Sequence, residues 1–315
     1  MNLFLERSCD QGCAFCYARE WLEDQLPARA SLAELQPLFE HYASLVAHAG
    51  PPPPWDGEGG EAAMLRRVAG TVTLLGGEPT AHPEFPEVVR TLRGLGLGVC
   101  LFTAGSHPER VRVVADQLWF VTLNGRFVRR AQALGIDPSR LSAHLALRPG
   151  DDVVALLTGV ANEGVSSVVL AFAAPAGGAD GPFFTPDDLP AMAEVYSQAS
   201  QSAKALGITL GWDCSFPSCL DPGRFPARCL PAPVLDPRGL VSVCGGAYFL
   251  ESAARPLLDF DSLAGLHAFT MDLYARLRRR PTPFAACADC AELPQACHGG
   301  CLALRRGYGE AARPG

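Results

Sequence analysis

The chain has 315 residues, 48% of them apolar, and a formal net charge of −7. This length suffices for one large domain and a small second one, and the acidic balance argues against nucleic acid or an anionic membrane as a partner. No apolar run reaches the length of a membrane-spanning helix, and the motif that begins at Cys9 leaves no room for a signal peptide. We therefore expect a cytoplasmic protein, in which the twelve cysteines indicate metal ligation rather than disulfides.

The first predicted element is a short apolar strand at residues 1–6, and three cysteines follow it closely. Cys9, Cys13 and Cys16 are separated by three and two residues, in the sequence Cys-Asp-Gln-Gly-Cys-Ala-Phe-Cys. Three thiolates at this spacing can bind three irons of a cubane cluster and leave the fourth iron open to a substrate. The same three cysteines, taken alone, also fit a zinc knuckle or a chance grouping.

A helix is predicted next, at residues 31–49. Ser31 stands before its first apolar position and Glu34 follows three residues later, which is the pattern of a capping box. The stretch 50–60 contains four consecutive prolines and several glycines, so neither a helix nor a strand can include it. We interpret it as an insertion.

The second predicted strand, at residues 71–75, ends in Gly76-Gly77-Glu78-Pro79. By itself this sequence indicates a turn that closes a strand. Two glycines also let the backbone approach a ligand closely, and an acidic or carbonyl group there can accept hydrogen bonds from an ammonium group. Its place one βα unit after the three cysteines favours the second interpretation.

The cysteine loop and the Gly-Gly-Glu-Pro element together resemble the radical S-adenosylmethionine (radical SAM) superfamily. The resemblance implies that S-adenosylmethionine (SAM) binds the open iron of a [4Fe–4S] cluster and is cleaved reductively to a 5′-deoxyadenosyl radical, which removes a hydrogen atom from the substrate. It implies a metal site at Cys9, Cys13 and Cys16 and a cofactor site that includes Phe15, Tyr17, Gly76, Gly77, Glu78 and Pro79. A valine at Gly77 would then crowd the cosubstrate and leave the cluster in place. The resemblance assigns no catalytic residue.

The remaining elements continue the alternation of strands and helices. Strands are predicted at residues 97–103, 118–123, 141–147 and 166–173, and helices at 84–94, 108–116, 151–163 and 186–206. With the strands already described they make six βα units, which right-handed crossovers would close into a partial (β/α)6 TIM-like barrel. We therefore expect an α/β protein with its barrel at residues 1–212.

Barrels of this kind bind ligands at the carboxyl ends of their strands. Thr103 and Asn124 stand at such ends and are interpreted as hydrogen-bonding the ribose or the methionine carboxylate of SAM, with a turn or capping role as an equal alternative. Arg148 would neutralise a carboxylate there or remain solvated. His144, in the middle of a strand, is expected to be a packed core histidine, and Cys100 a small buried apolar residue.

Residues 213–315 form a second, cysteine-rich module. Its cysteines are Cys214, Cys219, Cys229, Cys244, Cys287, Cys290, Cys297 and Cys301. A hairpin around Gly239 and residues 241–243 would present Cys244. The spacing resembles the SPASM or twitch extension of radical SAM enzymes, which carries one or two auxiliary [4Fe–4S] clusters, and structural zinc is the alternative.

The family pattern implies a ligand set for each auxiliary cluster. The first would be held by Cys219, Cys229, Cys244 and Cys301, and the second by Cys287, Cys290 and Cys297. Cys214 competes with Cys219 as the upstream ligand of the first. No cysteine follows Cys301, so the second cluster would be open at one iron, be completed by Cys214 or a non-cysteine ligand, or be absent. Gly245 stands where the sulfatase-maturing branch has an aspartate, which disfavours that branch.

The resemblance also suggests a substrate. Enzymes with this extension most often act on ribosomally made peptides, so a peptide maturase that forms a crosslink or similar bond is the leading hypothesis. Because the barrel begins at the first residue, a separate leader-binding protein or a leaderless mode would be required, together with a flavodoxin or ferredoxin-type electron donor. The alternatives are a small-molecule radical SAM dehydrogenase or rearrangement enzyme and, less favoured because it needs no cosubstrate site, a non-catalytic metal or electron carrier.

Overall fold

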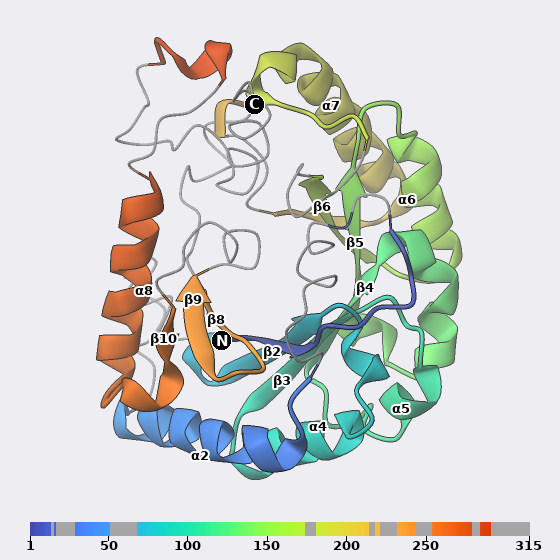
Figure 1. The fold of residues 1–315 in the computed structure, drawn as a ribbon. Helices are drawn as coiled ribbons and strands as arrows, with labels where there is room; N and C mark the ends of the chain where they lie inside the picture. The colour runs from blue at the N-terminus through green and yellow to red at the C-terminus, as the bar shows by residue number, and fades with distance from the viewer. Residues whose placement is uncertain are drawn as a thin grey trace.

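The fold was analysed in a computed structural model of the chain. The structure describes residues 1–13, 16, 29–50, 68–173, 181–213, 218–220, 232–243, 254–278 and 284–290. Within these residues a single ten-stranded sheet has the order β10-β9-β8-β1-β2-β3-β4-β5-β6-β7. Figure 1 shows the sheet curving through the molecule, with helices arranged around its outer side. The predicted α/β class and partial barrel are confirmed.

Seven consecutive strands of this sheet run parallel. They are β1 (Asn2–Glu6), β2 (Thr71–Gly76), β3 (Gly98–Thr103), β4 (Phe120–Asn124), β5 (Leu141–Leu147), β6 (Ser167–Phe172) and β7 (Thr209–Trp212). The first six correspond to the predicted strands. The short β7 was not predicted, because four residues with a central glycine carry little alternation signal.

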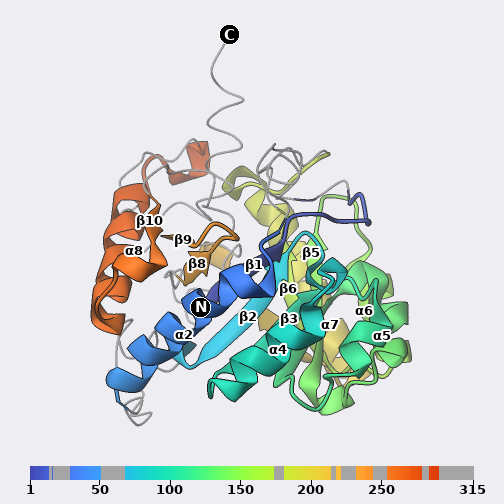
Figure 2. The same ribbon diagram turned by 60° about the horizontal axis from the view of Figure 1, so that its bottom comes forward.

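The predicted hairpin around Gly239 is present and belongs to the same sheet. β8 (Pro233–Leu235) and β9 (Leu240–Val243) are antiparallel, and Gly239 takes a positive φ of 80° in their turn. β8 pairs with β1 in parallel, and the two-residue β10 (Arg255–Pro256) extends the edge. Figure 2 shows these strands beside β1, flanked by α8 (Leu263–Arg278). The division of the chain at residue 212 stays a prediction.

The helices follow the predicted order. They are α2 (Leu32–His48), α4 (Phe85–Gly94), α5 (Pro108–Arg112), α6 (Val153–Asn162) and α7 (Leu189–Leu206), with a ten-residue 3-10 segment, η2 (Gly125–Leu134), between β4 and β5. The capping box of Ser31 and Glu34 is confirmed at the start of α2. Among the described residues, no helix is both long enough and apolar enough to cross a membrane.

Buried and half-buried side chains alternate along the strands, and this alternation distinguishes a helix-facing surface of the sheet from an inner surface. On β5, Leu145 and Leu147 are buried whereas His144 and Ala146 are half-buried. Phe102 on β3 and His144 on β5 are two strands apart, yet their ring centroids lie 5.2 Å from each other. Side chains two strands apart converge in this way on the concave side of a curved sheet, so His144 faces the inside of the barrel.

Candidate functional site

The three N-terminal cysteines lie on the loop that follows β1. Cys9, Cys13 and Cys16 are half-buried, and the Cys16 amide donates a hydrogen bond to the Cys13 carbonyl (3.1 Å). Burial raises the pKa of the Cys9 thiol to about 11, and burial followed by the neighbouring Cys16 raises that of Cys13. Cys16 also contributes to the raised pKa of Cys9, so the three thiols form one electrostatic group.

This group fits a soft metal centre by its chemistry. Three half-buried sulfur donors are ligands that select iron–sulfur clusters or zinc, and a bound metal removes the thiol protons that burial would otherwise retain. In the described part of the chain, no three His, Cys, Asp or Glu side chains are arranged as a complete metal site. The coordination of Cys9, Cys13 and Cys16 therefore stays a prediction.

The two glycines at the end of β2, Gly76 and Gly77, pack directly against the base of the cysteine loop. The Gly77 amide donates to the Glu6 carbonyl (2.7 Å) and the Glu78 amide to the Ser8 carbonyl (3.0 Å). Gly76 has a φ of 145°, and a Cβ there would overlap the Glu6 carbonyl oxygen. A Cβ at Gly77 would likewise overlap the backbone of Ser8, one residue before Cys9. A larger residue at Gly77 would therefore displace the cysteine loop itself, in contrast to the expectation that it leaves the cluster in place.

The carboxylate of Glu78 is fully buried and saturated by donors from the protein. Its Oε1 accepts from the Thr80 amide (3.0 Å), the Thr80 hydroxyl (2.6 Å) and the Thr103 hydroxyl (2.6 Å), and its Oε2 accepts from the Ala104 amide (2.7 Å). The Thr103 hydroxyl also accepts from the Gly105 amide (2.8 Å). Contacts of this element with a cosubstrate would therefore come from its backbone. The side chains of Glu78 and Thr103 tie the end of β2 to the end of β3.

Two arginines complete this corner of the barrel. Arg110, from α5, donates through Nη1 to the carbonyls of Thr80, Ala81 and His82 at 2.8–2.9 Å, at the end of the short 3-10 helix after Glu78. Arg130, from η2, donates to the Ala104 carbonyl (2.9 Å) and to Oε1 of Gln11 in the cysteine loop (3.0 Å). Sequence inspection missed both, since neither arginine belongs to a motif.

The inner face of β5, together with the end of β7, holds a second polar group. His144 Nε2 lies 3.1 Å from Oδ2 of Asp213, which directly follows β7. The side chains are 18% and 44% exposed. His144 pairs in register with Asn124, the last residue of β4, so it stands at the level where that strand ends. The expectation of a packed core histidine was wrong, because the inner face of a partial barrel is only half-buried.

The remaining predicted cofactor contacts have mixed outcomes. Asn124 Oδ1 accepts from the Arg126 amide (3.1 Å) and so caps η2. Arg148 stands half-buried at the end of β5, where its amide donates to Asp151. Pro79 is buried at the start of its 3-10 helix. Cys100 is half-buried on the inner side of β3 rather than fully buried. Phe15 and Tyr17 lie outside the described residues, and all these contacts stay predictions.

Part of the predicted auxiliary ligand set can be located. Cys219 is exposed in a short 3-10 turn after β7, and the Cys290 amide donates to the Cys287 carbonyl (3.3 Å). The Ala286 amide donates to Asp187 (2.7 Å). This bond ties the turn that contains Cys287 to the residues just before α7. The other predicted ligands lie outside the described residues, namely Cys214, Cys229, Cys244, Cys297 and Cys301.

Comparison with known proteins finds likeness at the level of fold. No protein-family profile matches the chain, and no curated protein sequence does. Among solved structures, Streptococcus suis SuiB bound to S-adenosylmethionine superimposes with a TM-score of 0.64 at 13% identity, over 96% of this chain and 72% of that one. The chain has the fold of SuiB. SuiB alone gives a TM-score of 0.63 at 13% identity, over 96% of this chain and 72% of that one. SuiB bound to precursor peptide SuiA gives a TM-score of 0.63 at 14% identity, over 96% of this chain and 71% of that one. The barrel fold expected from the two motifs is thereby confirmed.

Proposed function

We propose that this protein is a radical SAM enzyme in which Cys9, Cys13 and Cys16 hold a [4Fe–4S] cluster and the backbone of Gly76 and Gly77 receives the SAM bound at its open iron. The observation that supports the proposal is the contact between Gly77 and the Ser8 backbone, because it brings the Gly-Gly-Glu-Pro element against the base of the cysteine loop. The likeness to a protein crystallised with SAM supports it. Neither observation depends on the spacing from which the cluster was first inferred.

When bound, the cluster and SAM would, with one electron from an external donor, supply radical chemistry that removes a hydrogen atom from the substrate. The residues of the chain would bind and orient the cluster, SAM and the substrate. Glu78 and Thr103 fix the loop that contacts the methionine end, and Arg130 fixes the interior of the cysteine loop. Phe102 and the half-buried side chains around it line the inner face over which a substrate would lie. Apolar lining of this kind keeps water from a reactive intermediate.

We propose a ribosomally made peptide as the substrate, because SuiB was crystallised with its precursor peptide in the same fold. One or two auxiliary clusters would be held by cysteines after β7, of which Cys219, Cys287 and Cys290 are described. A flavodoxin or ferredoxin would supply the electron, and the thiolate ligands favour a reducing, cytoplasmic compartment. The bond formed in the peptide is not part of the proposal.

Cluster and SAM chemistry are tested together on anaerobically reconstituted protein. With dithionite and SAM, the wild-type chain should form 5′-deoxyadenosine, and a variant with alanine at Cys9, Cys13 and Cys16 should form none and lose about one cubane of iron. Cys100→Ala serves as the control, since that thiol lies inside β3, away from the loop. Equal iron in the triple variant and wild type would contradict the assignment.

The substrate class needs a separate measurement. Short peptides encoded beside the gene are added to the active protein, and mass spectrometry follows both 5′-deoxyadenosine and each peptide. A peptide that raises 5′-deoxyadenosine formation and changes mass supports a maturase. Active SAM cleavage that no such peptide stimulates would favour the small-molecule alternative.

A further inference from the structure

A polar network joins the interior of the cysteine loop to the rest of the barrel. Gln11, which lies between Cys9 and Cys13, donates through Nε2 to Asp10 (2.6 Å) and to Ser106 Oγ (2.8 Å). Ser106 in turn donates to Asp10 (3.0 Å). The loop that carries two of the three predicted cluster ligands is thus bonded to the loop that follows β3.

Arg130 stands at the centre of this network. Its Nη1 donates to Gln11 Oε1 (3.0 Å) and to the Ala104 carbonyl (2.9 Å). The amide of the same Ala104 donates to Glu78 (2.7 Å). Two hydrogen bonds at one residue therefore link Arg130 to the Gly-Gly-Glu-Pro element, and a third links it to the cysteine loop.

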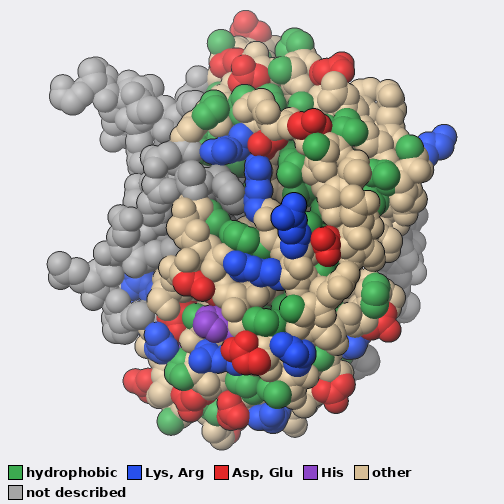
Figure 3. Space-filling view, turned by 90° about the vertical axis from the view of Figure 1, so that its right-hand side faces the viewer, with side chains coloured by type: hydrophobic (Ala, Val, Ile, Leu, Met, Phe, Trp, Pro, Cys, Tyr) green, Lys and Arg blue, Asp and Glu red, His purple; other side chains and the backbone are tan. Residues whose placement is uncertain are grey.

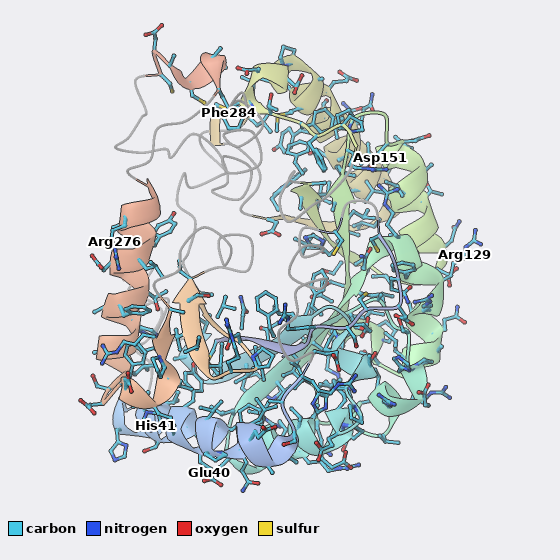
Figure 4. All side chains as sticks on the ribbon, in the orientation of Figure 1. Glu40, His41, Arg129, Asp151, Arg276 and Phe284 are labelled. Atoms are coloured by element: carbon cyan, nitrogen blue, oxygen red, sulfur yellow. The ribbon has the colours of Figure 1, made fainter. Side chains whose placement is uncertain are left out.

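The charge of Arg130 distinguishes it from its two neighbours on η2. Arg126 is paired with Asp151 at 2.6 Å, and Arg129 is exposed, pointing away from the barrel in Figure 4. The hydrogen-bond acceptors of Arg130 are neutral oxygens, and no carboxylate pairs with it in the described part of the chain. Figure 3 shows Lys and Arg side chains interspersed with Asp and Glu side chains on the side of the molecule that lies at the right of Figure 1. Arg126 and Arg130 both interact electrostatically with the Cys13 thiol. A cation near this thiol whose hydrogen-bond acceptors are all neutral favours a negatively charged group bound there.

We propose that Arg130 is a positioning residue that holds the part of the cysteine loop between Cys9 and Cys13 at a fixed distance from the Gly-Gly-Glu-Pro backbone, so that SAM could contact both at once. The inference rests on the proposed function. SAM would bridge two loops that leave two different strands, and a displacement of about 1 Å between groups that act together can cost a reaction about two orders of magnitude. A planar guanidinium holds two acceptors in set directions, which a lysine cannot do.

The test uses reconstituted protein and SAM as the probe. Electron paramagnetic resonance of the reduced N-terminal cluster is recorded while SAM is added, for wild type, Arg130→Met, Arg130→Lys and Arg129→Met. We expect Arg130→Met to keep its iron, because all three thiols remain, but to need about tenfold more SAM for the spectral change. Its cluster should also have a lower midpoint potential, since a cation has been removed. Relative to Arg130→Met, Arg130→Lys should restore the midpoint potential more fully than it restores the affinity for SAM, because lysine keeps the positive charge but not the planar arrangement of donors.

Gln11→Leu leaves the arginine and changes no charge, but it removes the acceptor of Arg130 together with the two hydrogen bonds that Gln11 donates to Asp10 and Ser106. We expect it to weaken SAM binding without lowering the potential, and the double variant Gln11→Leu, Arg130→Met to lose less SAM affinity than the sum of the two single losses. An unchanged SAM titration in both single variants, or an equal loss in Arg129→Met, would overturn the inference while leaving the proposed function intact. Wild-type protein without a reducible N-terminal cluster would overturn the proposed function and, with it, this inference.

Discussion

The two walls of the barrel mouth are built differently. Around β1, β2 and β3, the Glu78 carboxylate has four donors, Arg110 holds three carbonyls and no room is left beside Gly76 or Gly77. Around β5, β6 and β7, the polar pair of His144 and Asp213 is joined by one contact and remains partly exposed. The first wall is rigid, as the proposed binding of SAM requires. The second wall leaves polar side chains available to the proposed substrate.

The largest effect is expected where the first wall has no space. Gly77→Ala introduces a Cβ that overlaps the Ser8 backbone, and relief of such an overlap costs about 1–3 kcal/mol or more and moves the segment that leads to Cys9. We expect loss of most N-terminal cluster iron and of 5′-deoxyadenosine formation. Iron content and SAM cleavage after reconstitution measure this.

Gly70→Ala is the matched control, because Gly70 directly precedes β2 and no atom lies within 4 Å of its would-be Cβ. It should retain both iron and activity. Wild-type iron content in Gly77→Ala would show that the loop adjusts freely and that the first wall is not rigid.

Glu78→Gln should have the next largest effect. An amide nitrogen would replace one carboxylate oxygen and face donors, and each hydrogen bond to a charged group contributes about 1.5–3 kcal/mol. We expect lower thermal stability and weaker SAM binding, with the cysteine ligands unchanged. The exposed Glu87, which pairs with Arg90 on the surface of α4, provides the control Glu87→Gln. Equal melting temperatures for the two variants would contradict a structural role for the Glu78 carboxylate.

The sequence predicted the fold and the first wall better than the second. Apolar strands ending in Gly76-Gly77-Glu78-Pro79 and a capping box at Ser31 are local signals, and the structure has both elements where they were expected. Arg130 and Asp213 act through partners 119 and 69 residues away. No local pattern marks such partners, since the curvature of the sheet brings them together. The pairing of β8 with β1 was likewise not predicted, because the two strands are far apart in the chain and no local pattern marks them as partners.

Substitutions in the second wall should separate substrate turnover from SAM cleavage. His144→Gln and Asp213→Asn leave the cysteine loop untouched, so 5′-deoxyadenosine formation without peptide should equal that of wild type. With a peptide substrate, conversion should fall by about tenfold or more, because a paired imidazole and carboxylate on the inner face can accept a substrate proton or hydrogen bond. Mass spectrometry of the peptide and of 5′-deoxyadenosine gives both quantities. Loss of cleavage without peptide would place the pair with the first wall instead.

The smallest effect concerns thiol reactivity in the metal-free protein, where the same difference between the walls should appear. Burial raises the pKa of Cys9 to about 11, whereas Cys219, after β7, is exposed. Since the thiolate is the reactive form, iodoacetamide at pH 8 should label Cys219 before Cys9, and labelling of Cys9 should rise about tenfold per pH unit up to its pKa. Between the ordinary thiol pKa of 9.0 and the raised pKa of about 11, the folded state keeps a proton that the unfolded state releases, so the stability of the metal-free protein should fall as pH rises through this window. Peptide mapping measures the labelling and chemical denaturation the stability. Cys9 labelled as fast as Cys219 at pH 8 would mean that the cysteine loop opens freely without its metal, and that the rigidity of the first wall depends on the bound cluster.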